Sequence, residues 1–196
     1  DSDTLILEIK INDELEICKV PFRNKLEVSI RVVTTKAAEA ILKHTSPYIL
    51  ARHYLYRDSE GCFGLGRYLL SKEADDPSLE AIGYYVYTGG YVTEGNFIEA
   101  ERMVRKGLDK HPKDINLHAA LSTILRNEGR SSESIKECKK IISMLDANTP
   151  INRVTLSYLN LSSILYEIGK YDSALLVLNQ GLEIDNKYAE LYSQRA

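Results

Sequence analysis

Histidine and cysteine side chains bind most protein-held zinc, and the chain has four histidines and three cysteines. A zinc site needs such ligands in closely spaced pairs, and no histidine here has a cysteine at that spacing. These residues are Cys18, His44, His53, Cys62, His111, His118 and Cys138. We therefore expect no bound metal. The odd number and wide separation of the cysteines favour reduced thiols in a cytoplasmic protein, with a surface redox pair as the alternative.

The glycine-rich stretch "GCFGLGRYL", which begins at Gly61, is the nearest approach to a phosphate-binding loop. It lacks the Gly-Lys-Ser/Thr ending of such loops, and no clear parallel strand precedes it, so a turn followed by a helix start is the simpler interpretation. No Ser-His-Asp set and no pair of carboxylates can be named. The sequence therefore predicts a non-catalytic chain without cofactors.

The composition is that of an ordinary folded protein. Of 196 residues, 44% are hydrophobic and 27% charged, and the net charge is −3. This charge gives no basic surface for nucleic acid or anionic membranes. No apolar run approaches the roughly 18–20 residues that span a bilayer. We therefore expect neither a nucleic-acid partner nor a membrane span.

A repeat organises the second half of the chain. Gly61, Gly95 and Gly129 stand 34 residues apart, and Gly169 follows 40 residues later, one period plus the six residues 149–154. Within each period, small residues recur where two helices of a pair would face each other: Thr88 and Ala100, Ser122 and Ser134, Ser162 and Ala174. Small side chains let helix backbones approach closely, and a glycine ends the first helix in the left-handed conformation.

Both the period and these residues resemble the tetratricopeptide-repeat family. The resemblance is strong over residues 81–196, as units 81–114, 115–148 and 155–188 with a partial unit at 189–196. It is weaker over 47–80, a degenerate helical pair, and does not cover 1–46. It implies a mainly α fold, a right-handed α–α superhelix. Since the partial unit ends without a partner helix, we expect the natural protein to continue beyond Ala196.

Residues 1–33 show a different pattern. "TLILEIKI" and "ELEICKV" alternate around Asn12-Asp13, and "LEVSIRVV" alternates again. Such alternation predicts a β-hairpin and a third strand, after which Thr34 or Thr35 caps a helix. The segment 1–46 is thus expected to be a small β-containing unit, or the edge of another domain.

The resemblance also implies a site. In tetratricopeptide arrays the first helices line a concave groove that binds an extended peptide or a partner helix. The family's groove positions correspond here to Tyr85, Asn116, Thr123, Arg126, Asn127, Asn160, Ser163, Tyr166 and Glu167. Asn160 resembles the asparagine with which many such grooves bind a ligand's backbone. The alternative is that these residues form only a solvated polar face.

Family members that clamp a C-terminal carboxylate have a lysine and an asparagine on one first helix and further basic residues on later ones. Those places hold Tyr85 and Gly89, and later Glu190 and Gln194, so that clamp is not expected. The predicted function is a non-catalytic protein–protein interaction module that binds a protein or peptide partner. One alternative is an accessory or regulatory region of a larger enzyme or transcriptional regulator. Another is self-association into a homo-oligomer through the last helix or a strand edge.

Overall fold

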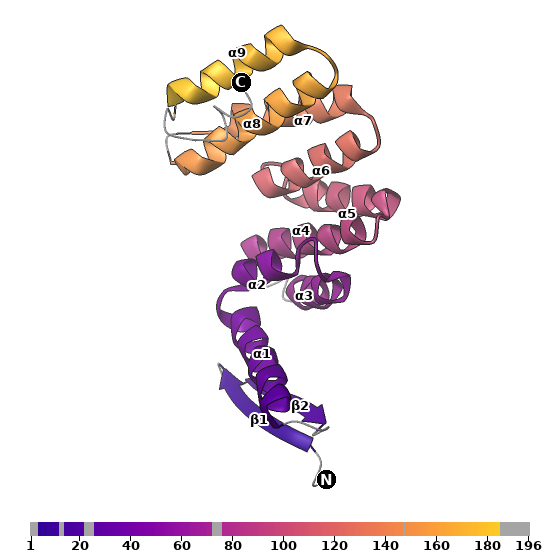
Figure 1. Ribbon diagram of the computed structural model, residues 1–196, viewed down its shortest axis with the longest axis vertical. Coiled ribbons are helices and arrows are strands. Elements are labelled where there is room, and N and C mark those ends of the chain that lie inside the picture. The colour runs from indigo at the N-terminus through magenta and orange to yellow at the C-terminus, as the bar shows by residue number, and fades with distance from the viewer. Residues whose placement is uncertain (1–3, 12–13, 22–25, 72–75, 147, 185–196) are drawn as a thin grey trace.

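A stack of paired helices with a β-hairpin at one end makes up the molecule (Figure 1). The computed structural model describes residues 4–11, 14–21, 26–71, 76–146 and 148–184. The strands are β1 (Thr4–Ile11) and β2 (Glu14–Pro21). The helices are α1 (Leu26–Thr45), α2 (Pro47–Tyr54), α3 (Ser59–Ser71), α4 (Pro77–Thr93), α5 (Phe97–Lys110), α6 (Ile115–Asn127), α7 (Ser131–Met144), α8 (Ile151–Glu167) and α9 (Tyr171–Ile184). The predicted helical solenoid with an N-terminal hairpin is confirmed, while the partial unit 189–196 lies outside the described residues.

The predicted third strand is wrong, because residues 26–33 belong to helix α1. At helical spacing Ser29, Val33 and Ala37 lie on one face, and all three are buried. Val33 and Ala37 pack against Cys18 and Val20 of β2. This small-residue stripe covers the hairpin, so tertiary burial overrides the β propensity of the branched residues.

The predicted helix start at Thr34 or Thr35 is wrong for the same reason. Both residues lie inside α1, and their hydroxyls donate back to the carbonyl of Arg31, at 2.9 Å from Thr34 and 3.0 Å from Thr35. A hydroxyl that bonds to the preceding turn is compatible with a helix interior.

Side-chain contacts of Glu16 connect the hairpin to helix α1. β1 and β2 are antiparallel, with Leu7 opposite Cys18. Glu16 of β2 accepts a hydrogen bond from Lys43 Nζ, and its Oε1 lies 3.0 Å from His44 Nε2. The other ring nitrogen of His44 lies 2.9 Å from the hydroxyl of Tyr68 in α3. One imidazole thus links the hairpin to α1 and to the helical stack.

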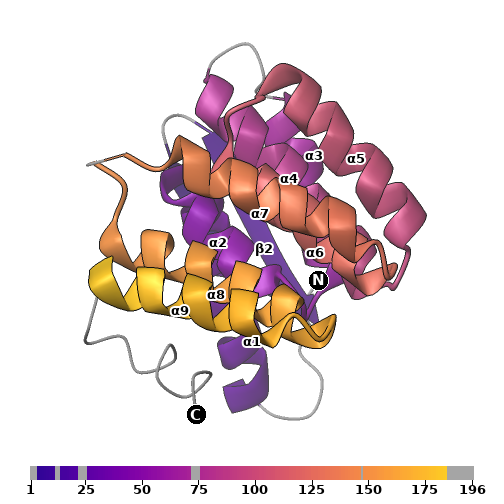
Figure 2. The same cartoon turned by 90° about the horizontal axis from the view of Figure 1, so that it is seen from above.

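The turns that join α4 to α5, α6 to α7 and α8 to α9 each depend on a glycine. Gly95, Gly129 and Gly169 have φ of +72°, +74° and +76°, as predicted for residues that end a first helix. In the first turn the N–H of Asn96 donates to the Tyr91 carbonyl at 2.9 Å, which satisfies the end of α4. Figure 2, which looks down the stack, shows the successive pairs rotated relative to one another.

The two helices of a pair meet at the predicted small residues. Ser122 of α6 and Ser134 of α7 are buried, with their hydroxyl oxygens 2.9 Å apart, and Ser134 Oγ donates to the Ser122 carbonyl at 2.7 Å. Thr88 and Ala100 of the preceding pair are buried as well. Buried hydroxyls that find partners at the contact cost little, so polar small residues suit this position.

His118 of α6 is a polar residue in the interior of the helical stack. It is buried, with Nδ1 2.6 Å from Glu137 Oε2 of α7 and Nε2 3.0 Å from the Pro112 carbonyl. The imidazole therefore joins α6 both to α7 and to the connection that follows α5.

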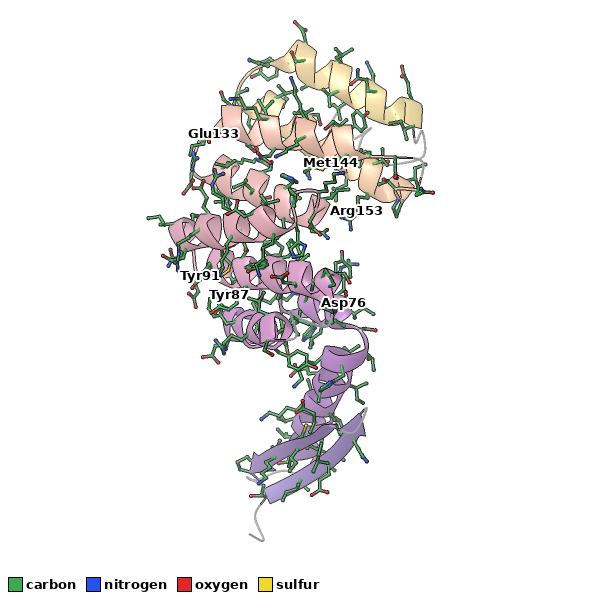
Figure 3. All side chains as sticks on the ribbon, turned by 180° about the vertical axis from the view of Figure 1, so that it is seen from behind. Asp76, Tyr87, Tyr91, Glu133, Met144 and Arg153 are labelled. Carbon is green, nitrogen blue, oxygen red and sulfur yellow. The ribbon has the colours of Figure 1, made fainter. Side chains whose placement is uncertain are left out.

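Aromatic residues hold α3 against α4. The rings of Tyr87 and Tyr91 contact Phe63 of α3 at centroid distances of 5.1 and 5.0 Å (Figure 3). Tyr84 turns away from this cluster and is buried with Val104 and Leu117. Tyr84, Tyr87 and Tyr91, which helical spacing places on one side of α4, therefore make two different contacts.

Substitutions at two glycines of α3, Gly64 and Gly66, can test how closely α3 and α4 approach each other. A Cβ at Gly66 would lie 2.9 Å from Tyr87 Cβ, which cannot move unless α4 moves, whereas a Cβ at Gly64 would meet nothing within 4 Å. Gly66→Ala should lower the free energy of unfolding by about 1–2 kcal/mol, because overpacking outweighs the gain in helix propensity. Gly64→Ala, the matched control, should raise it by up to about 1 kcal/mol. Urea unfolding followed by circular dichroism measures both, and equal effects would contradict the close contact.

The anchoring of the hairpin should depend on pH. The hydrogen bond from Lys43, and then that from His44, hold the pKa of Glu16 below its ordinary value of 4.5. Stability from this carboxylate is therefore present at neutral pH and is lost as the pH falls through the lowered pKa. Glu16→Gln should cost about 1 kcal/mol or less of unfolding free energy near pH 7, and nothing well below pH 4. A cost that is the same at both pH values would show that Glu16 does not act through its charge.

Candidate functional site

The first helices of successive pairs line one continuous side of the stack. Helix α4 packs on α6, and side-chain bonds connect α6 to α8. A narrow pocket lies between α4 and α6, lined by Tyr85, Thr88, Gly89, Val92, Ala120 and Thr123 and closed by Leu55 and Tyr56. Tyr85 and Thr123, which come from different predicted units, therefore line one pocket.

The turn after α2 forms the N-terminal end of this groove. Helix α2 has 8 residues, compared with 17 in α4, 13 in α6 and 17 in α8. It stops at Tyr54, and the chain turns through Tyr56, which has a φ of 65°. Leu55 is buried over α4, where a Cβ at Gly89 would overlap Leu55 Cδ2. The short helix and the glycine together let this turn lie against the groove.

A larger, open pocket of about 400 Å³ adjoins the turn. It is lined by Tyr48, Arg52, Leu55, Tyr56, Arg57 and Tyr85. Burial raises the pKa of Tyr85 to about 12, helped by the neighbouring phenols of Tyr56 and Tyr48, while Arg153 of α8 acts in the opposite direction. The Tyr85 hydroxyl therefore remains protonated and able to donate at physiological pH. Since Tyr85 also lines the narrow pocket, the two pockets meet at its ring.

Further along the groove, several predicted contacts are paired with each other. Arg126 Nε of α6 donates to Glu167 Oε2 of α8 at 2.7 Å, and Arg126 Nη2 donates to Oε1. The bond to Glu167 raises the pKa of Arg126. Arg153 Nη1 donates to Asn116 Oδ1 at 2.6 Å, and Figure 3 labels this arginine. A ligand here meets side chains that already satisfy one another.

The remaining predicted residues differ in what they offer a ligand. The hydroxyls of Thr123 and Ser163 donate to carbonyls of their own helices, Ala119 at 3.0 Å and Leu159 at 2.8 Å. Tyr166 is exposed and its ring lies 5.2 Å from that of Tyr171. Asn127 and Asn160 are exposed, and their amides have no hydrogen-bond partner within the part of the chain that the structure describes.

The predicted set missed the residues that α2 and its turn contribute: Tyr48, Arg52, Tyr56 and Arg57. A signal was present, because Tyr54 and Arg57 depart from the small and apolar residues that the repeat pattern requires there. Within the described ranges no group of three or more His, Cys, Asp or Glu could hold a metal ion. In the same residues, no helix has the length and apolar character needed to cross a membrane.

Comparison with known proteins identifies the fold. Residues 156–188 match the family described as tetratricopeptide repeat. The crystal structure of TTC0263, described as a thermophilic TPR protein in Thermus thermophilus, superposes with a TM-score of 0.66 at 17% identity, over 86% of this chain and 90% of that one. The crystal structure of YrrB, described as a TPR protein with an unusual peptide-binding site, gives a TM-score of 0.52 at 20% identity, over 82% of this chain and 79% of that one. No curated protein matches the sequence significantly.

The left-handed turn at Tyr56 can be tested directly. Tyrosine in this region of backbone space costs about 1–2 kcal/mol relative to glycine. Tyr56→Gly and Tyr56→Ala delete the same exposed ring, but only glycine relieves the backbone. The glycine variant should therefore be about 0.5–1 kcal/mol more stable than the alanine variant after the greater freedom of its unfolded chain is counted. An alanine variant of equal or greater stability in thermal unfolding would contradict this turn geometry.

Proposed function

We propose that this chain, which matches the tetratricopeptide-repeat family over residues 156–188 and has the fold of such proteins, is a non-catalytic module that binds an extended peptide segment of a partner protein. The proposed site is the groove of α4, α6 and α8. The observation that carries the proposal is the pair of pockets that meet at Tyr85, between α4, α6 and the turn after α2. An interaction module is the general role of this fold, and the peptide-binding site named for YrrB supports the choice of ligand.

The side chains along the groove suit a peptide backbone. The exposed amides of Asn127 and Asn160 can each donate and accept, as an extended backbone requires. The pair formed by Arg126 and Glu167 is partly exposed, so it costs little to open and can exchange its partner for a ligand group. Tyr166 adds an exposed ring at the C-terminal end.

We further infer that α2 and α3 form a shortened first repeat.

One observation favours a second role, contact with another domain or another copy. The outer face of the hairpin, opposite the face that α1 covers, exposes Ile6, Leu15 and Ile17, and among the described residues each strand pairs only with the other strand. Apolar side chains beside open strand edges are typical of a surface that packs on something. Light scattering at several concentrations separates the cases, since a constant monomer mass excludes self-association.

The groove is tested with peptides selected from a random library displayed on phage against the full chain. Affinities of a selected peptide are then measured by fluorescence anisotropy. Asn127→Ala with Asn160→Ala should weaken binding about tenfold or more, because buried amide bonds to the peptide are lost. Both residues are exposed, so the variant should keep its circular dichroism spectrum.

A control variant carries two alanines on α5, at Glu99 and Arg102, which form an exposed ion pair on a second helix. It should bind the peptide as the parent chain does. Equal affinity in the parent and the asparagine variant would place binding outside this groove. Failure to select any peptide would contradict the proposed function.

A further inference from the structure

The open pocket beside α2 combines cationic and aromatic side chains in a way that selects a particular ligand group. We propose that it binds the carboxylate of an aspartate or glutamate side chain in the partner peptide. This proposal rests on the proposed function, since the peptide that enters the pocket is the one that the groove holds. It adds what the groove alone does not determine, a requirement for an acidic residue near one end of the bound segment.

The pocket lining offers charged donors and no carboxylate. Arg52 and Arg57 both line it, and neither has an acidic partner among the residues that the structure describes. No aspartate or glutamate lines the same pocket. Two uncompensated guanidinium groups in one hollow are unusual on a chain with a net charge of −3, and each presents a planar set of N–H donors that matches a carboxylate.

The tyrosines strengthen this preference. Tyr48, Tyr56 and Tyr85 also line the pocket, and phenol hydroxyls can donate to an anion while their rings form apolar walls. The Tyr85 phenol is protonated at physiological pH, and burial raises its pKa further, to about 12, so it stays a donor. Arg52, Tyr56 and Arg57 are exposed, so a carboxylate on the peptide can reach both guanidinium groups from solvent.

The local backbone holds the arginines in place. Arg57 follows directly after Tyr56, whose φ of 65° sets the direction of the turn, and Leu55 anchors the other side over Gly89. Arg52 lies in the last turn of α2. Because Tyr85 lines both pockets, a peptide that lies between α4 and α6 can place one side chain beyond Tyr85 without leaving the groove.

The same phage selection tests the inference when it is run in parallel on the parent chain and on Arg52→Gln with Arg57→Gln. Peptides selected by the parent should carry aspartate or glutamate at one fixed position, and those selected by the variant should keep the remaining motif but lose the acid. The control is Arg67→Gln with Arg102→Gln, which removes the same charge from exposed sites on α3 and α5. The control should keep the acidic position.

Binding of synthetic peptides then measures the energetic coupling between the acidic residue of the peptide and the two arginines. Replacing the acidic residue by its amide should weaken binding to the parent about tenfold or more, and should change binding to the double arginine variant by less than about twofold. Selected peptides without an acidic position would overturn the inference and leave the groove function standing, whereas no selected peptide would overturn both. Binding that needs phosphoserine in place of the acid would also overturn it, in favour of a phosphate site.

Discussion

The close approach of the two helices in each pair is the contact on which the whole structure depends. At this contact the side chains are small: Thr88 and Ala100 are both buried, and the hydroxyl oxygens of Ser122 and Ser134 lie 2.9 Å apart. Since a single pair cannot bury its own apolar face, Tyr84, Val104 and Leu117 form a core only where α4, α5 and α6 come together. The stack winds because each pair repeats this contact, and winding leaves the first helices along one continuous side.

The groove is therefore a consequence of regular packing, while its most distinctive pocket arises where the regularity stops. Helix α2 ends after 8 residues, and the chain turns at Tyr56 instead of continuing alongside α4. The space that a longer helix would fill is open and is lined by arginine and tyrosine. Elsewhere in the groove Arg126 and Glu167 neutralise each other, whereas Arg52 and Arg57 have no acidic partner among the described residues.

The sequence predicted those features that repeat. The period of 34 residues, the left-handed glycines and the small residues at helix contacts are each fixed by local chemistry, and the structure has them. The strand predicted at residues 26–33 failed because alternation also fits a helix when Ser29, Val33 and Ala37 form its buried stripe. Residues 26–33 are helical because the hairpin packs on this stripe, and the local sequence pattern does not encode that packing.

The candidate site could likewise be predicted only where its residues occupy regular positions of the repeat. The family's positions located Tyr85 and Thr123, which share a pocket. They could not show that Arg126 pairs with Glu167, because that contact joins residues 41 apart through the geometry of two repeats. Arg52 and Arg57 were missed because they lie where the pattern breaks, and broken repeats carry no position to transfer.

Hydrogen exchange measured on the chain with and without a selected peptide tests the central claim most directly, because it reports where the ligand lies without any substitution. The account predicts slower exchange in α4, α6 and α8 and in the turn after α2, with α5 and α7 unchanged. Protection confined to α5 and α7, or to the hairpin, would contradict the assignment of this groove as the binding site.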